Sequence, residues 1–160
     1  MSDYGWEADG LVLCKRQCDS EQMLSLTCHC GTVRVDVNCE PDYVNECNCT
    51  LCTKAGARWG YFNPEAVTIS GTTSAYERFD VDQPTAVLQF CRVCGSTTHY
   101  ELTEFAQKNL GPDARIGVNM RLASDDDLQG VEVRYADGRN WSGSGAFGYV
   151  RPARHIGTDA

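Results

Sequence analysis

The strongest regular pattern in this chain is the alternation of apolar and polar residues. Residues 32–37 read Thr-Val-Arg-Val-Asp-Val, the period of a strand with one buried face. Residues 24–28 alternate in the same way, and a Cys-His-Cys-Gly turn separates the two stretches. Gly31 can supply the positive φ that such a tight turn needs. The pattern therefore predicts a β-hairpin with two cysteines at its tip.

Strand signals of the same kind recur along the chain at a spacing of about ten residues. We expect strands at 58–62, 66–69, 75–79, 86–91, 97–102, 115–122 and 131–135. A short helix is predicted over 103–110, where Gly111-Pro112 would end it. Many short strands at this spacing are typical of an antiparallel architecture. The predicted fold class is therefore mainly β, with antiparallel sheets and cysteine-bearing turns.

The length of 160 residues suits one domain with a single core. Residues 1–22 show no clear period and are expected to form an N-terminal arm. Residues 23–142 carry the strand signals and the main cysteine clusters, and 143–160 are expected to form a loose C-terminal tail. The sequence has neither a long apolar run nor the apolar start of a secretory signal. We therefore expect a cytoplasmic protein.

The charge balance argues against two classes of partner. The chain has 14 Lys and Arg residues against 22 Asp and Glu residues, a formal net charge of -8. Nucleic-acid binding depends on cations that neutralise phosphates, and the chain has no basic run. We expect no nucleic-acid partner and no membrane partner. The oligomeric state stays open, with a homodimer as one option.

The ten cysteines indicate metal binding more than disulfides, because a reducing compartment keeps thiols free. Cys28 and Cys30 are two residues apart, and so are Cys47 and Cys49. A disulfide across so short a segment would be badly strained, whereas a tetrahedral metal accepts both sulfurs. Cys14 and Cys18 lie in the expected arm and are interpreted as spare thiols.

The remaining pattern contains three clusters, which read CHCG, CNCTLC and CRVCG. Structural zinc takes four ligands, so the two-cysteine clusters together make one closed site. The middle cluster fills three corners of a tetrahedron and leaves one open, unless Cys39, His29 or His99 closes it. The predicted ligands are Cys28, Cys30, Cys91 and Cys94 for the closed site, and Cys47, Cys49 and Cys52 for the open one.

An open site of three thiolates has a definite chemical preference. The three negative charges exceed the charge of Zn²⁺, so the metal would be a weak Lewis acid. A sulfur-rich site is better matched to a further thiolate than to hydroxide. A thiol cosubstrate is therefore the expected fourth ligand.

The order of the clusters resembles the glutathione-dependent formaldehyde-activating enzyme family, which includes the centromere protein V type. The similarity covers roughly residues 24–140, with support from 117–122 and from 135–140. It implies a fold of the β-tent type (Mss4-like), with a structural zinc on the four-cysteine set and a functional zinc on the three-cysteine set. It also implies a carbon–sulfur lyase that condenses formaldehyde with glutathione. Because members differ in substrate, a small-molecule thiol and an aldehyde are expected in general terms.

The catalytic residues are less clearly marked. His99, Tyr100 and Arg92 are candidates for proton transfer, although a strand tyrosine is more often a packing residue. Trp59 is expected in the core, with a place beside the second metal as the alternative. The rival interpretation is a non-catalytic zinc-binding module for protein interaction, in which the second zinc is structural.

Two further motifs are set aside. Residues 143–148 match G-x-G-x-x-G, but Tyr149 to Pro152 cannot continue as the helix that nucleotide binding requires. Residues 125–127 are three consecutive aspartates, which we interpret as a solvated turn.

Overall fold

The computed structural model of the protein describes residues 23–111, 114–142 and 146–158. The expected N-terminal arm, with Cys14 and Cys18, lies outside the described residues, and so does the start of the glycine motif at 143–145. Within the described part, no helix is long and apolar enough to cross a membrane.

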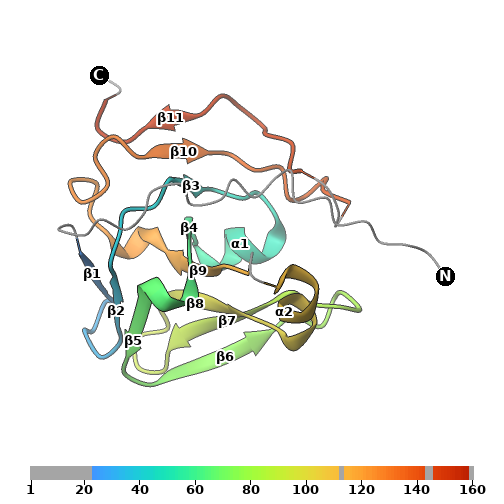
Figure 1. Ribbon diagram of the computed structural model, residues 1–160, viewed down its shortest axis with the longest axis horizontal. Coiled ribbons are helices and arrows are strands. Elements are labelled where there is room, and N and C mark those ends of the chain that lie inside the picture. The colour runs from blue at the N-terminus through green and yellow to red at the C-terminus, as the bar shows by residue number, and fades with distance from the viewer. Residues whose placement is uncertain (1–22, 112–113, 143–145, 159–160) are drawn as a thin grey trace.

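The described residues form eleven strands in two sheets, with two short helices (Figure 1). The small sheet has the order β1-β2-β5, and the large sheet has the order β11-β10-β3-β4-β9-β8-β7-β6. The bounds are β1 Leu24–Thr27, β2 Arg34–Val37, β3 Tyr43–Asn45, α1 Thr50–Ala55, β4 Trp59–Phe62, β5 Val67–Ser70, β6 Thr73–Glu77, β7 Ala86–Cys91, β8 Thr97–Leu102, α2 Glu104–Leu110, β9 Ile116–Asn119, β10 Glu132–Arg134 and β11 Arg154–His155. The predicted mainly β fold is confirmed.

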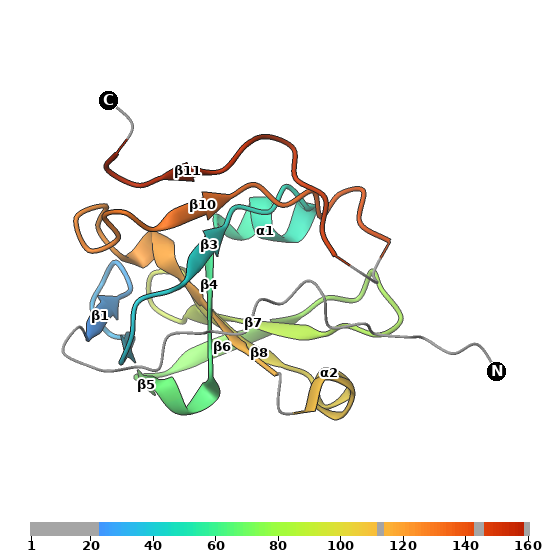
Figure 2. The ribbon, with the colours of Figure 1, turned by 45° about the horizontal axis from the view of Figure 1, so that its top comes forward.

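The large sheet extends from one side of the molecule to the other. Figures 1 and 2 show β10 and β11 at one end and β6 to β8 at the other, and in the view of Figure 1 α1 lies between them. The small sheet stands beside β4 and β9. The main apolar core draws side chains from both sheets and includes Leu26, Val35, Phe62, Val118 and Val133.

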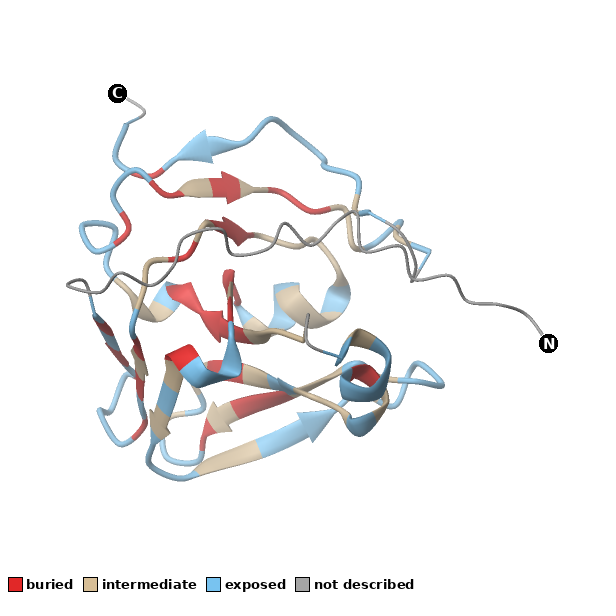
Figure 3. Ribbon diagram, viewed as in Figure 1, coloured by how far each residue is buried: buried red, intermediate tan, exposed pale blue. Residues whose placement is uncertain are grey.

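The predicted hairpin is present, and its register explains the alternation in the sequence. β1 pairs with β2 in antiparallel fashion, with Leu24 opposite Val37 and Leu26 opposite Val35. Every second residue of β1 is buried (Figure 3). The apolar positions therefore face the core, and the cysteine turn projects from the end of the hairpin.

One strand pair departs from the antiparallel prediction, because β3 and β10 run parallel, with Val44 opposite Val133. A parallel pair needs a long connection, and here most of the domain lies between the two strands. The sequence did not indicate β3, whose residues are all buried and therefore do not alternate. The expected strand 115–122 is also shorter. It ends at Asn119, whose side chain accepts a hydrogen bond from the backbone N–H of Arg121 and starts a 3₁₀ turn.

The predicted helix is confirmed as α2, where the Thr103 side chain accepts a hydrogen bond from the backbone N–H of Ala106. The second helix, α1, was missed because six residues are too few for a clear apolar period. Its cap was visible in the sequence, since Gly56 takes the left-handed conformation that often ends a helix.

The last described residues differ from the loose tail that the sequence predicts. Residues 154–155 form β11 against β10, and Ile156 is only 2% exposed within the main core. One buried residue between polar neighbours has no period, so the sequence carries no strand signal there.

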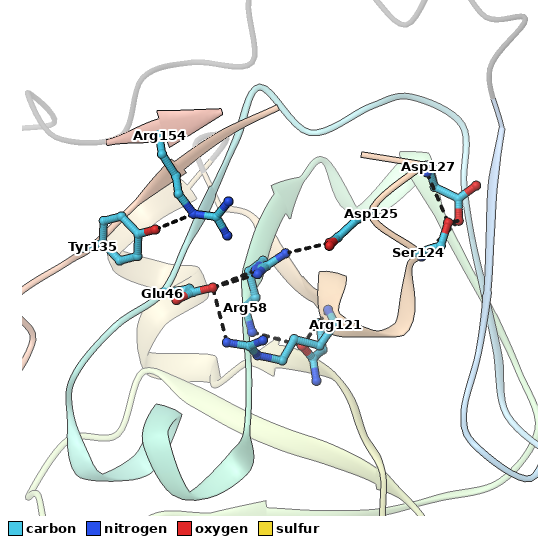
Figure 4. Close-up of polar contacts among 9 residues, drawn as sticks. Glu46, Arg58, Arg121, Ser124, Asp125, Asp127, Tyr135 and Arg154 are labelled. Atoms are coloured by element: carbon cyan, nitrogen blue, oxygen red, sulfur yellow. Dashed lines mark hydrogen bonds and ion pairs between the residues drawn. The ribbon is translucent and has the colours of Figure 1, made fainter. Parts of the chain in front are cut away.

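A charged cluster around Arg58 includes Glu46, the residue before Cys47 (Figure 4). The Arg58 side chain is only 9% exposed, and its guanidinium lies 2.8 Å from Glu46 and 3.7 Å from Asp125. Arg121 lies 3.2 Å from the same Glu46 oxygen. Because Glu46 directly precedes Cys47, this cluster anchors the start of the cysteine loop. Asp125 is thus in an ion pair, although its side chain stays largely solvated as expected.

We expect Arg58→Met to lower the free energy of unfolding by about 2–4 kcal/mol, because it leaves the half-buried Glu46 carboxylate with one cation. The measurement is denaturant unfolding with zinc in excess. Arg34→Met is the matched control, since the Arg34–Asp36 pair is on the surface and an exposed pair contributes about 0–1 kcal/mol. Equal destabilisation by the two substitutions would contradict the anchoring role.

Candidate metal centres

The first cluster joins the tips of two hairpins. Cys28 and Cys30 follow β1, while Cys91 ends β7 and Cys94 lies in the turn before β8. Their four sulfurs all lie within 4.8 Å of one another. The Cys28–Cys30 and Cys30–Cys91 sulfur separations are 3.5 and 3.6 Å, close to the ~3.8 Å edge of a tetrahedron with ~2.3 Å zinc–sulfur bonds. The predicted four-cysteine set is therefore assembled in space.

Backbone and hydroxyl donors surround these sulfurs. The Val33 N–H donates to Cys28 Sγ over 3.2 Å, and the Val93 N–H donates to Cys91 Sγ over 3.4 Å. The Thr32 hydroxyl lies 3.0 Å from Cys30 Sγ and 3.2 Å from Cys91 Sγ. The Ser96 hydroxyl, 3.3 Å from Cys94 Sγ, helps to lower the pKa of Cys94 to about 5. Such donors stabilise thiolates, which are the form that binds metal.

The second cluster is built around the start of α1. Cys47 follows β3, Cys49 is the N-cap residue of α1, and Cys52 lies in its first turn. Cys49 Sγ accepts the Cys52 backbone N–H over 3.4 Å, and Cys47 Sγ accepts the Cys49 N–H over 3.5 Å. The indole N–H of Trp59 donates to Cys52 Sγ over 3.3 Å. All three sulfurs lie within 4.8 Å of one another.

Without a metal, the three thiols share their charge unequally. Hydrogen bonds from the Cys47 and Cys52 thiols lower the pKa of Cys49. The bond with Cys49 raises the pKa of Cys47, and the bonds with Cys47 and then Cys49 raise the pKa of Cys52. The backbone N–H of Cys52 also favours the Cys49 thiolate. When one of the three thiols loses its proton, the negative charge therefore lies on the N-cap sulfur of Cys49, where it would attract a cation.

A loop from the far end of the chain covers this cluster. The Asn48 side chain donates to Asp137 over 2.7 Å and accepts from the backbone N–H of Arg139 over 2.8 Å. Gly138 lies between these two contacts. A Cβ on Gly138 would overlap Cys47 Sγ and come within 3.2 Å of the Cys49 Cβ. Only glycine therefore lets the loop close over the sulfurs.

Asn48 and Gly138 are the site residues that sequence reasoning missed. The sequence placed a turn at Asp137-Gly138, but nothing in its spacing showed that this turn packs on cysteines about 90 residues earlier.

The donor sets fit soft transition metals such as zinc. Both sets consist of sulfur only, and the eight described cysteines form no disulfide. Among the described residues, no fourth Cys, His, Asp or Glu joins the three-cysteine cluster. Cys39 packs against the main core, and His29 is exposed. His99 is buried, but it belongs to neither cysteine cluster. The three alternatives that the spacing left open do not close the second site.

The two catalytic candidates on β8 have different surroundings. The Tyr100 ring packs edge-on against Trp59 at 5.0 Å and belongs to the aromatic cluster that also contacts Cys52. The contacts of His99 are with Thr98, at 3.0 Å from Nδ1, and with Glu101, at 3.7 Å from Nε2. Burial lowers the pKa of His99, so the imidazole is neutral at pH 7. Arg92 is exposed in the turn of the first cluster.

A second tyrosine, Tyr61, joins the same aromatic cluster from β4. Its hydroxyl accepts a hydrogen bond from the Asn45 amide over 3.1 Å, and Tyr43 lies 5.8 Å from its ring. Burial raises the pKa of both Tyr61 and Tyr100. Both phenols therefore stay protonated at neutral pH and can donate hydrogen bonds beside the cluster.

The fold and the two clusters define a class, a β protein whose described residues include two all-cysteine groups that could hold a metal ion, one of four sulfurs and one of three. The model of the glutathione-dependent formaldehyde-activating enzyme family matches residues 23–117, a span that includes the seven cysteines of both groups. The chain belongs to that family.

The comparison with solved structures also finds a similar chain. The chain is similar to the crystal structure of a Rhodobacter sphaeroides protein from a structural genomics project. The two are 27% identical with a TM-score of 0.50, over 68% of this chain and 97% of the other. A comparison with curated proteins finds no match.

We expect Cys28→Ser and Cys49→Ser to have different effects. The four-cysteine cluster ties two distant hairpins together, and structural zinc contributes ~10–16 kcal/mol in small zinc peptides. Cys28→Ser should therefore abolish cooperative unfolding. Cys49→Ser should keep the fold and one metal per chain, because the cysteines of the second cluster lie in one short segment and do not join distant parts of the chain. Circular dichroism and elemental analysis measure both effects, with Cys39→Ser as the control. Equal unfolding of both variants would contradict the division.

We also expect Gly138→Ala to reduce the metal content from two ions to one per chain, because the added methyl group displaces Cys47. The readout is mass spectrometry of the metal-loaded native protein. Gly148→Ala is the matched control, since a Cβ there meets nothing within 4 Å. A Gly138→Ala protein that keeps both ions would show that the loop does not press on the cluster.

Proposed function

We propose that this protein is a zinc-dependent carbon–sulfur lyase that joins a thiol such as glutathione to a small aldehyde, or releases the thiol from the adduct. The observation that supports this function best is the three-cysteine cluster, which has no fourth ligand among the described residues. Three protein ligands and an open position are the arrangement of catalytic zinc sites, whereas structural sites have four.

The reaction balances without an external oxidant or reductant. The thiol sulfur forms a bond to the aldehyde carbon, the C=O π electrons move to the oxygen, and the thiol proton ends on that oxygen as a hydroxyl. In the lyase direction the C–S bond breaks, and the proton returns to sulfur. The protein therefore needs to hold a thiolate, orient an aldehyde and move one proton.

Cys47, Cys49 and Cys52 would hold the zinc, which as a soft metal would favour a thiolate as its added ligand. The chain's own residues hold the three cysteines, so that the fourth coordination position stays available to the thiol. The Trp59 N–H fixes Cys52, and the Asn48 amide ties the covering loop over Cys47 and Cys49. With its ligands held in this way, the site can bring thiol and aldehyde together in a defined orientation.

The proton on the aldehyde oxygen requires a donor that is protonated at neutral pH. Tyr100 and Tyr61 meet this condition, because burial raises the pKa of each, and both pack in the cluster that contacts Cys52. We assign them the role of hydrogen-bond donors to the developing oxyanion. His99 is neutral and hydrogen-bonded away from this cluster, so a structural role suits it better.

The test is thiol–aldehyde exchange on protein purified under nitrogen, measured by NMR exchange spectroscopy because the condensation also proceeds without enzyme. We expect the zinc-loaded protein to accelerate the interconversion of glutathione, formaldehyde and their adduct. Cys49→Ser should reduce the acceleration at least ~100-fold, since removing a group on which catalysis depends has effects of this order. Cys39→Ser, outside both clusters, is the control. A protein with both zinc ions and no acceleration for any thiol and aldehyde would contradict the proposal and favour the interaction module.

A further inference from the structure

An open groove of about 470 Å³ lies along α1, the helix that carries Cys52. One wall is the exposed face of α1, and the others come from β6, β7 and the turn after Cys94. The lining residues are Thr50, Leu51, Lys54, Ala55, Tyr76, Phe79, Asp80, Leu88, Phe90, Gly95 and Thr97. The groove adjoins the second metal centre, because Leu51, Ala55 and Leu88 also belong to the apolar cluster that contacts Cys52.

The walls of this groove are more apolar than the binding of formaldehyde or glutathione alone would require. Leu51, Leu88 and Phe90 are among its lining residues, and so is Phe79, which is 88% exposed. Exposing a phenylalanine to water is unfavourable, and a continuous apolar surface around it marks a binding site more often than a bare surface. Formaldehyde has no alkyl group that could occupy such a wall.

Two charged residues line the groove, the acidic Asp80 and the basic Lys54. Asp80 lies 2.7 Å from Arg78, so its charge is compensated. Lys54 is exposed on α1 and makes no ion pair with the described residues. A ligand that places an apolar chain along the floor and a carboxylate at the Lys54 ammonium would use both features.

We propose that this groove binds the apolar part of the substrate, which is the adduct of a carboxylate-bearing thiol with an alkyl or aryl aldehyde and not with formaldehyde alone. This inference rests on the proposed function, because the thiol sulfur is placed at the three-cysteine metal. The thiol carboxylate binds Lys54, and the aldehyde chain lies against Leu51, Leu88 and Phe79.

Binding can be measured without turnover by using stable thioethers. We expect S-hexylglutathione to bind the zinc-loaded protein at least ~10-fold more tightly than S-methylglutathione in calorimetry, since each buried CH₂ contributes up to about 0.8 kcal/mol. Phe79→Ala should reduce the ratio of the two affinities toward one. Lys54→Ala should weaken both ligands by a similar factor and keep the ratio. Met23→Ala, another exposed apolar residue but outside the groove, should change neither.

Turnover with formaldehyde, hexanal and benzaldehyde separates the two proposals. A preference for hexanal or benzaldehyde that falls in Phe79→Ala supports the groove assignment. Acceleration of all three aldehydes alike, with equal affinities for the two thioethers, would overturn the groove while leaving the lyase function intact. Tight S-hexylglutathione binding that depends on Phe79, without any turnover, would instead contradict the lyase function and keep the groove.

Discussion

The structure depends on the convergence of four sulfurs from two hairpins. Cys28 and Cys30 stand at the tip of the small sheet, and Cys91 and Cys94 at a turn of the large sheet, so their common cluster joins the two sheets at one point. Because so small a domain has a limited apolar core, a bound metal here would supply a large part of the net stability. The Val33 and Val93 amides and the Thr32 hydroxyl orient these sulfurs.

The second cluster is held by elements of the large sheet. Its sulfurs come from one short segment, so their mutual spacing needs no tertiary fold. Its surroundings do need one. Trp59 reaches Cys52 from the next strand, and Gly138 covers Cys47 from a loop beyond β10. The Glu46–Arg58 ion pair holds the entry to the segment. Together these three elements fix the cysteine segment in place.

This division has a chemical reason. A four-ligand site satisfies its metal and has no place for a substrate, whereas a three-ligand site must be protected from collapse without being closed. In the proposed function, the loop tied by Asn48 and the rings of Trp59, Tyr61 and Tyr100 hold the three cysteines without adding a fourth ligand from the described residues. Burial raises the pKa of both phenols, which are therefore protonated at neutral pH.

The sequence by itself determined the candidate ligand sets, the hairpin that carries Cys28 and Cys30, and the mainly β class, because each depends on local spacing or on a period of two. It could not determine the parallel contact of β3 with β10, the strand β11 that precedes the buried Ile156, or the closure of Gly138 over Cys47. Each of these features joins residues far apart in the chain through isolated contacts, which leave no periodic pattern in the sequence. The tertiary structure alone decided that His99 lies away from both clusters and that Tyr61, from another strand, joins Tyr100 beside Cys52. A side chain's neighbours across a sheet are set by strand order and register, which local residue patterns do not encode.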